Sequence, residues 1–322
     1  MGKKDDYQYD YLDSYARFAD QVNGALFGGR QVVKADELEP ADAVAVYLGK
    51  EVGARENYKY ITDKARTWRG RLIHIITIQN QTYVDYRMVI RNMLAESIGY
   101  HKQWKQKKAV HEEAEDLAEG SDTFMSKMNK DEKFIPIITL VVYYGTGHGW
   151  DGARCLYDLL DIDEEMKEFV TNYKLNLYDC HEHDTFDEYH TGLRQLFEVT
   201  RYCNDKEQLK RVMEENREAY SSLDSETIEI IKVAANVDIT EKHKTMENGE
   251  ERYNMCKAFE DYKLEGKIEG KIESILELLE ELGQVPQRIV ELINSQDSMD
   301  VLTRWHKTAA KAETIAEFEA NM

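Results

Sequence analysis

Three polar residues, Asp63, Gln79 and Gln81, have the types and spacing that could hold a divalent cation. Metal-dependent cleavage of a phosphodiester needs clustered oxygen ligands, so that Mg²⁺ bridges the protein and the phosphate. An economical arrangement puts one acid on a strand and an acid-x-basic or acid-x-amide pair on the neighbouring strand, because residues i and i+2 of a strand face the same side. Asp63, followed across a hairpin by Gln79-Asn80-Gln81, has this layout.

The segments around these residues predict strands. Tyr58, Tyr60 and Thr62 recur at every second position, as in a strand, Arg69-Gly70 supplies a turn, and residues 72–78 are rich in β-branched side chains. Both faces of the run 72–78 are apolar, which is typical of a strand in the middle of an α/β sheet. Apolar runs at residues 134–144 and 173–177 predict two further strands.

Helical spacing of apolar residues predicts the elements that pack around this sheet. Residues 15–26 and 84–104 show this spacing, and Arg91 lies inside the apolar stripe of the second helix. Residues 109–132 are acidic and polar, and we expect a loop there. A helix through Leu156–Leu160 is expected after the glycine-rich GTGHGW segment.

No long strand signal remains beyond about residue 184. We therefore expect an α/β core over residues 10–180 and an all-helical C-terminal region over residues 184–322. An amphipathic helix is expected near residues 253–282, where the EGKI-EGKI repeat lies. Its apolar stripe is either a helix-pairing surface, through which the chain could form a homo-oligomer, or the buried side of a solvated helix. The stripe consists of Leu264, Ile268, Ile272, Ile275, Leu279 and Leu282.

Basic residues could contact a nucleic acid in two places. The run from His101 to His111 contains no acid and is the best candidate surface for DNA phosphates, although lysines near a helix C-terminus also complement the helix dipole. Arg91 could face either a phosphate or a carboxylate, and an ordinary buried ion pair explains it equally well. The lysines of the run are Lys102, Lys105, Lys107 and Lys108.

The overall charge restricts how DNA could bind. The formal net charge is -20, and an acidic surface repels a phosphate backbone. Contact with DNA must therefore use a local basic patch or a bridging metal ion.

Cysteine spacing and hydropathy indicate the compartment. Four widely spaced cysteines form no CxxC pair, which is consistent with free thiols in a reducing cytosol. The N-terminus has no apolar run typical of a secretory signal. The longest apolar stretch, residues 134–144, is too short to cross a bilayer. We expect a cytoplasmic protein without a membrane segment.

Two other motifs suggest chemistry only weakly. Cys180-His181-Glu182-His183 contains zinc-ligand types, with His148 or His190 as a further donor, but adjacent ligands lack the spacing of a tetrahedral site. GTGHGW has neither the Lys-Ser/Thr of a phosphate-binding loop nor the GxGxxG spacing, so it predicts a turn.

Several segments together resemble the bacterial recombination-promoting nuclease / putative transposase (YhgA-like) family, which carries a PD-(D/E)XK nuclease domain. The matching order runs through nearly the whole chain, and its segments are TDKARTW, LIHIITIQNQTYVDYRMVIRNM, FIPIITLVVYYGTGHGWDGARCLYDLL, NYKLNLYD, MCKAFEDYKLEGKIEGKIES and WHKTAAKAETIAEFE.

The resemblance implies a restriction-endonuclease-like core with a mixed central sheet flanked by helices. It also implies Mg²⁺-dependent DNA cleavage in recombination or transposon-like mobility. By analogy, Asp63 binds the metal, Gln79 occupies the second metal-ligand position, and Gln81 orients the water or the phosphate.

The sequence departs from the family at one of these positions. Where the family usually reads IENQ, this chain reads Ile78-Gln79-Asn80-Gln81. Glutamine offers a carbonyl oxygen but not the negative charge that holds Mg²⁺. Asp85 is a poor replacement, because its separation is odd and a helix starts there. Three hypotheses follow: a DNA endonuclease with impaired cleavage, an inactive pseudo-nuclease that still binds DNA or protein, and an oligomerising protein working through the helix near residues 253–282.

Overall fold

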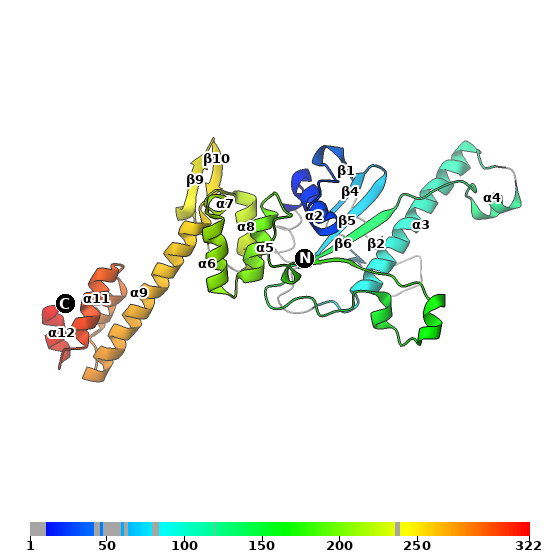
Figure 1. Cartoon of the computed structure of the whole chain (residues 1–322). Coiled ribbons are helices and arrows are strands. Elements are labelled where there is room, and N and C mark those ends of the chain that lie inside the picture. Colours follow the sequence, from blue (N-terminus) through cyan, green and yellow to red (C-terminus); the bar gives the residue numbers. More distant parts are fainter. Residues whose placement is uncertain are drawn as a thin grey trace. The chain divides into compact units, whose positions relative to one another are not determined.

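The computed structural model describes residues 11–41, 46–47, 59–60, 64–78, 84–118, 120–235 and 239–322. The chain divides into two compact units. The first unit comprises Met1–Asn216 and Leu223–Asp238, and the second comprises Arg217–Ser222 and Ile239–Met322. Figure 1 labels the elements along the chain.

The first unit is built on a mixed five-stranded sheet of order β1-β4-β5-β6-β7. β1 pairs with β4 and β4 with β5 in antiparallel fashion, whereas β5, β6 and β7 run parallel. The central position of β5 confirms the expectation drawn from its two apolar faces. A separate antiparallel pair joins β2 (Val46–Tyr47) to β3 (Lys59–Tyr60). The strands of the larger sheet are β1 (Leu38–Pro40), β4 (Lys64–Trp68), β5 (Arg71–Ile78), β6 (Ile137–Tyr143) and β7 (Asn176–Asp179).

The β4–β5 hairpin turns at the dipeptide that the sequence predicted. Arg69 and Gly70 both have positive φ, 45° and 70°, as a two-residue turn matching the twist of the strands requires. Trp68 pairs with Arg71 and Lys64 with Ile75. Of the predicted strand at residues 58–62, the described part is Lys59–Tyr60, which pairs with β2 instead.

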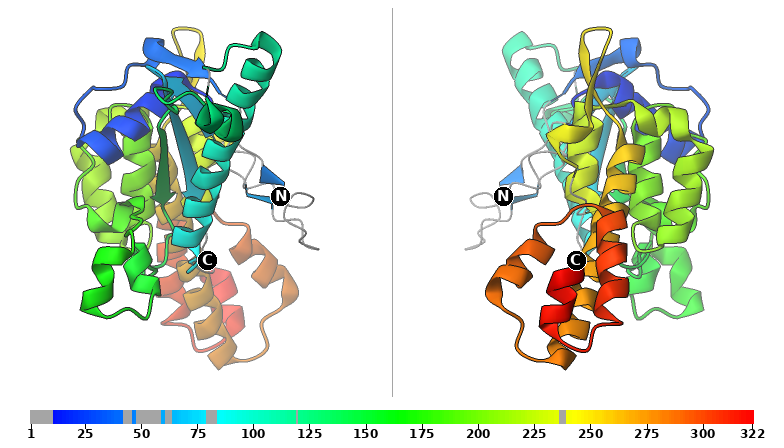
Figure 2. Two further views of the ribbon diagram at one scale, coloured as in Figure 1. Left: turned by 90° about the vertical axis from the view of Figure 1, so that its right-hand side faces the viewer. Right: turned by 90° about the vertical axis from the view of Figure 1, so that its left-hand side faces the viewer.

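Helices cover both faces of the sheet. The two views of Figure 2 show α3 (Met88–Ala114) on one face, with α2 (Tyr15–Phe27) and α5 (Leu193–Tyr202) on the other. α3 is the crossover between the parallel strands β5 and β6. Its Gly99 allows close approach to the sheet, because an added Cβ would lie 2.5 Å from Ile137 Cδ1.

Two excursions leave this core. α3 continues ten residues past the predicted end at Trp104, so the expected loop at residues 109–132 is partly helical: it contains the end of α3 and the short helix α4 (Ser121–Ser126). The predicted helix through Leu156–Leu160 is instead a pair of 3-10 turns, η2 (Leu156–Leu159) and η3 (Glu164–Phe169).

The remaining elements of the first unit lie beyond β7. α5 packs against α8 and α6, so the unit extends past the boundary expected near residues 180–184. These elements are η4 (Cys180–Glu182), α6 (Lys206–Glu215), β8 (Leu223–Asp224) and α8 (Ser225–Ala235), and η1 (Ala35–Glu37) precedes β1.

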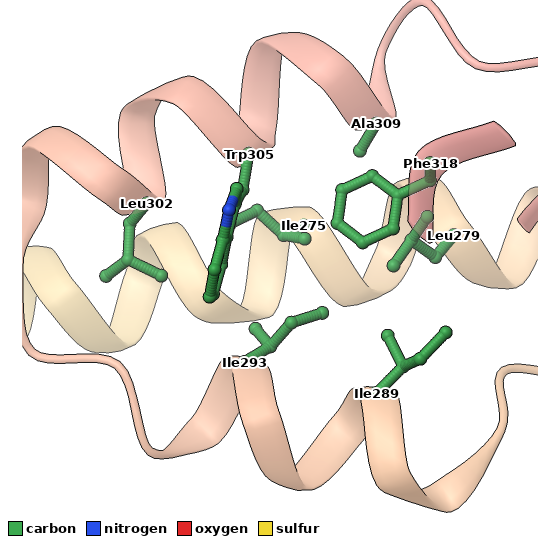
Figure 3. Close-up of a cluster of buried hydrophobic side chains, with 8 residues drawn as sticks. All are labelled: Ile275, Leu279, Ile289, Ile293, Leu302, Trp305, Ala309 and Phe318. Carbon is green, nitrogen blue, oxygen red and sulfur yellow. The ribbon is translucent and has the colours of Figure 1, made fainter. Parts of the chain in front are cut away.

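The second unit is organised around one long helix, α9 (Met255–Leu282). Figure 3 shows its Ile275 and Leu279 packed among side chains from the three helices that follow. The apolar stripe expected for α9 is thus covered within the chain at these positions, whereas Leu264 is 47% exposed. The other elements are α7 (Arg217–Ser221), η5 (Glu241–His243), β9 (Lys244–Glu247), β10 (Glu250–Tyr253), α10 (Gln287–Asn294), α11 (Met299–Ala309) and α12 (Ile315–Asn321).

The expectation of an all-helical C-terminal region over residues 184–322 is wrong. β9 and β10 form an antiparallel hairpin in which Glu247 pairs with Glu250. Asn248 and Gly249 occupy the turn with φ of 53° and 84°. Asn-Gly is the strongest short-range hairpin signal, and it outweighs the low strand propensity of the charged residues around it.

Candidate functional site

The three predicted metal-site residues, Asp63, Gln79 and Gln81, lie outside the described residues. The elements they border are described: Lys64 is the first residue of β4, and Ile78 is the last residue of β5. In an antiparallel hairpin the start of the first strand and the end of the second strand lie next to each other, at the end opposite the turn. The fold therefore brings Lys64 and Ile78 to the same end of the sheet.

Two more strands end at this edge. Ile78, Tyr143 and Asp179 follow one another in register across β5, β6 and β7. The carboxyl ends of parallel strands are where open α/β sheets place their binding sites. The region around Asp179 is therefore the described part of the candidate site.

Asp179 is a fully buried carboxylate that organises two loops. Its Oδ2 accepts the backbone N–H of Trp150 at 2.6 Å, and its Oδ1 accepts that of His181 at 2.9 Å. Tyr143 donates its hydroxyl to the carbonyl of His148 at 3.0 Å. The GTGHGW segment is a loop held by Asp179, which agrees with its interpretation as a turn.

The side chains near Asp179 that could bind zinc make other contacts. Donor atoms of Asp179, Cys180 and His181 lie within 4.8 Å of one another. However, burial, followed by the negative charge of Asp179, raises the pKa of the Cys180 thiol well above its usual range, so a thiolate is disfavoured. His181 Nε2 lies 2.5 Å from the carbonyl of Gly145, and Glu182 pairs with Arg154. These contacts argue against a metal centre there.

Arg91 and Asp85 lie at the start of α3. Asp85 accepts the backbone N–H of Arg87 at 3.0 Å and its Nε at 3.2 Å. Arg91 Nη1 lies 3.8 Å from the other oxygen of Asp85. Of the two partners considered for Arg91, the structure therefore shows a carboxylate. The carboxylate of Asp85 is occupied by arginines, which agrees with its being a poor replacement for a metal ligand.

The predicted phosphate-contact lysines lie on the far half of α3. Lys102 and Lys105 are exposed. Lys107 Nζ lies 3.6 Å from Glu132, and Lys108 Nζ lies 3.7 Å from Glu112. Solvent reaches both lysine side chains, which are 32% and 37% exposed, and ion pairs in contact with solvent are worth less than about 1 kcal/mol, so a phosphate could replace either carboxylate.

A polar cluster under α3 was not predicted. Asn92 and Thr139 are buried, and the side-chain amide of Asn92 has no hydrogen-bond partner among the described residues. Glu96, one turn beyond Asn92, faces Thr139 and Tyr173, and burial raises the pKa of this carboxyl. The i, i+4 spacing of Asn92 and Glu96 was the signal available in the sequence, because both fall on the apolar face of the helix.

A buried lysine also lies next to the candidate site. Lys64, 2% exposed, donates to Asp13 Oδ1 at 2.5 Å, and Arg66 Nη2 donates to the same oxygen at 3.1 Å. Burial would raise the pKa of Asp13, but the hydrogen bonds from these two cations bring it below its usual value. The start of β4 is thus anchored to the segment before α2.

These features define a mixed α/β protein in which one edge of the sheet collects a hairpin end, two parallel strand ends and several buried polar groups. Residues 121–229 match the family model described as "Putative transposase, YhgA-like". This match covers about a third of the chain, and over that segment the chain is similar to YhgA-like putative transposases.

The matched segment runs from α4 into α8 and does not include the β4–β5 hairpin. No curated protein and no solved structure matches the chain. Among the described residues, no helix is both long enough and apolar enough to span a membrane.

Proposed function

We propose that this chain carries a PD-(D/E)XK-type nuclease site at the β4–β5 hairpin and acts on DNA as a Mg²⁺-dependent endonuclease with impaired cleavage. The observation that carries the proposal is the position of this hairpin. It lies at the centre of a mixed sheet flanked by helices, and its open end borders Asp63 on one side and Gln79 to Gln81 on the other.

The donor set fits a hard cation through its oxygens but supplies little charge. Asp63 and Gln79 would hold Mg²⁺, and Gln81 would orient the attacking water or the phosphate. A bound Mg²⁺ neutralises phosphate charge and lowers the pKa of its water. With one carboxylate where the family usually has two, we expect weak metal binding and slow or absent cleavage.

DNA would reach this site through local cations, because the chain as a whole is acidic. The proposed phosphate contacts are Arg91 and the four lysines of α3, which are Lys102, Lys105, Lys107 and Lys108. For the lysines that pair with Glu112 and Glu132, phosphate would displace the carboxylate. Binding should therefore weaken steeply as salt concentration rises.

The test is cleavage of supercoiled plasmid with Mg²⁺ or Mn²⁺ by the parent chain, Asp63→Ala and Gln79→Glu. Nicking by the parent that disappears in Asp63→Ala supports the enzyme. Nicking that appears only in Gln79→Glu supports a degenerate site. If none of the three proteins cuts or binds DNA, the nuclease proposal is wrong.

A second candidate is an inactive pseudo-nuclease that binds DNA or a protein partner. The glutamine at position 79 and the net charge of -20 favour it. Gel-shift assays separate it from the enzyme, since it predicts DNA or partner binding without cleavage in every metal. The third candidate is a homo-oligomer in which copies of the chain pair through α9. The 47% exposure of Leu264 on that helix favours it.

A further inference from the structure

The excursion between β6 and β7 exposes an unusual amount of apolar surface. Within Leu156–Phe169, which we call the acidic turn segment, four large apolar side chains are exposed to between 39% and 74%. Single exposed apolar residues are normal, but several on one short segment mark an interaction surface. These side chains belong to Leu159, Leu160, Met166 and Phe169.

Hydrogen bonds hold the backbone of the acidic turn segment in a defined conformation. The hydroxyl of Tyr157 lies 2.6 Å from the carbonyl of Lys167 and 2.7 Å from that of Val170, so it ties the turn η2 to the turn η3. Asp158 accepts the backbone N–H groups of Arg154 and Cys155 at 2.8 and 2.9 Å. These hydrogen bonds therefore fix the backbone that carries the exposed apolar side chains.

The charge around these side chains is strongly negative. The acidic turn segment contains six carboxylates and one lysine. Asp161, Asp163, Glu165 and Glu168 are exposed and form no ion pair with another described residue. Such a surface repels nucleic acid and favours a partner that presents cations beside apolar groups.

The basic half of α3, His101–His111, is such a surface on the same chain. It contains four lysines and no acid, and its Val110 is 60% exposed. The ring of Trp104 stacks on that of His101 at 5.4 Å between centroids. The two surfaces are opposite in charge, and both expose apolar side chains.

These surfaces do not meet within one chain. The turn segment leaves the core beside the start of α3, where Gly152 approaches the side chain of Val84. The basic half begins 13 residues further along the helix, about 20 Å away at 1.5 Å per residue. Figures 1 and 2 show the green turn segment and the far end of α3 apart in each view.

We propose that the acidic turn segment of one copy of this chain binds the basic half of α3 of a second copy. In a two-fold dimer the contact occurs twice, since each copy offers both surfaces. The lysines used are also the proposed DNA contacts, so self-association competes with DNA binding. This inference does not depend on cleavage.

Charge reversal tests the pairing on the full chain. We expect the parent to dimerise in sedimentation-velocity experiments, and we expect Glu165→Lys/Glu168→Lys and Lys102→Glu/Lys105→Glu each to weaken the dimer by about tenfold or more, because like charges then face each other. An equimolar mixture of the two variants should dimerise again, since every contact in the mixed dimer pairs opposite charges. Glu214→Lys/Glu215→Lys on α6 reverses two exposed carboxylates elsewhere and should leave the dimer unchanged.

Three results would overturn the proposal. The parent chain could stay monomeric up to its solubility limit, either charge-reversed variant on its own could dimerise like the parent, or the mixture of the two variants could stay monomeric. A dimer lost only in Leu264→Lys would assign association to α9 instead. Far-UV circular dichroism of each variant confirms that the reversals leave the fold intact.

Discussion

The buried carboxylate of Asp20 is predicted to hold the segment before α5 onto α2. Asp20 is 4% exposed, and its Oδ2 accepts the N–H of His190 at 3.0 Å, the N–H of Thr191 at 2.8 Å and the hydroxyl of Thr191 at 2.7 Å. Asp20→Ala leaves all three donors without this acceptor. Asp20→Asn can keep the oxygen at the Oδ2 position and loses the charge.

The contacts give the size of each effect. A hydrogen bond to a charged acceptor contributes roughly 1.5–3 kcal/mol. Water can replace part of the lost hydrogen bonding once the carboxylate is removed, so the total loss is smaller than the sum of the three bonds. We therefore expect Asp20→Ala to lower the free energy of unfolding of the first unit by about 3 kcal/mol, and Asp20→Asn by about 1 kcal/mol. The matched control is Asp187→Ala, which removes an exposed partner of Arg194 and should cost less than about 1 kcal/mol.

Native-state hydrogen exchange is the suitable assay, because the two units can unfold separately and a single melting curve would mix them. Peptides from β6 and α5 report the first unit. An Asp20→Ala variant within about 0.5 kcal/mol of the parent would refute the reasoning, since ordinary surface changes fall in that range. Equal losses for Asp20→Asn and Asp20→Ala would show that the charge, rather than the acceptor, stabilises the segment.

Two further effects can be predicted. Gly24→Ala should destabilise the first unit by about 1–3 kcal/mol, because the new Cβ would lie 2.3 Å from the buried ring of Tyr189, which outweighs the higher helix propensity of alanine. Urea unfolding measures this loss of stability, and a gain in stability would contradict the prediction. Hydrogen bonds to Asp116 and Glu132 raise the pKa of His111, so these contacts stabilise the end of α3 when the imidazole is protonated and weaken as pH rises through the raised pKa. Faster hydrogen exchange around Glu132 above that pKa, absent in His111→Gln, is the expected result, and pH-independent exchange in the parent would contradict it.

Local chemistry in the sequence predicted the central part of the fold well. The two apolar faces of residues 72–78 placed β5 in the middle of the sheet, and Arg69-Gly70 marked the hairpin turn, because both signals depend on neighbouring residues. The β9–β10 hairpin was missed although Asn248-Gly249 marks it, since its strands are too charged to show an apolar pattern.

Long-range contacts were beyond prediction. A carboxylate partner for Arg91 was one of two predicted choices, but Asp85 was not identified as that partner, and the buried role of Asp179 was not foreseen at all. Asp179 depends on the parallel register of β6 with β7, which joins segments that local patterns treat separately. The exposure of Leu159 and Leu160 was hidden for the same reason: helical spacing suggested burial, and the backbone forms 3-10 turns instead.

The central claim is that position 79 is the metal-ligand position at which this chain has lost a carboxylate. Mn²⁺ binding measured by titration calorimetry tests it most directly, with the parent chain, Gln79→Glu, Asn80→Glu and Gln79→Glu/Asp63→Ala compared at one pH. The account predicts that Gln79→Glu binds Mn²⁺ at least about tenfold more tightly than the parent, that Asn80→Glu does not, and that Asp63→Ala removes the gain. Tighter binding in Asn80→Glu alone, or a gain that survives Asp63→Ala, would contradict it.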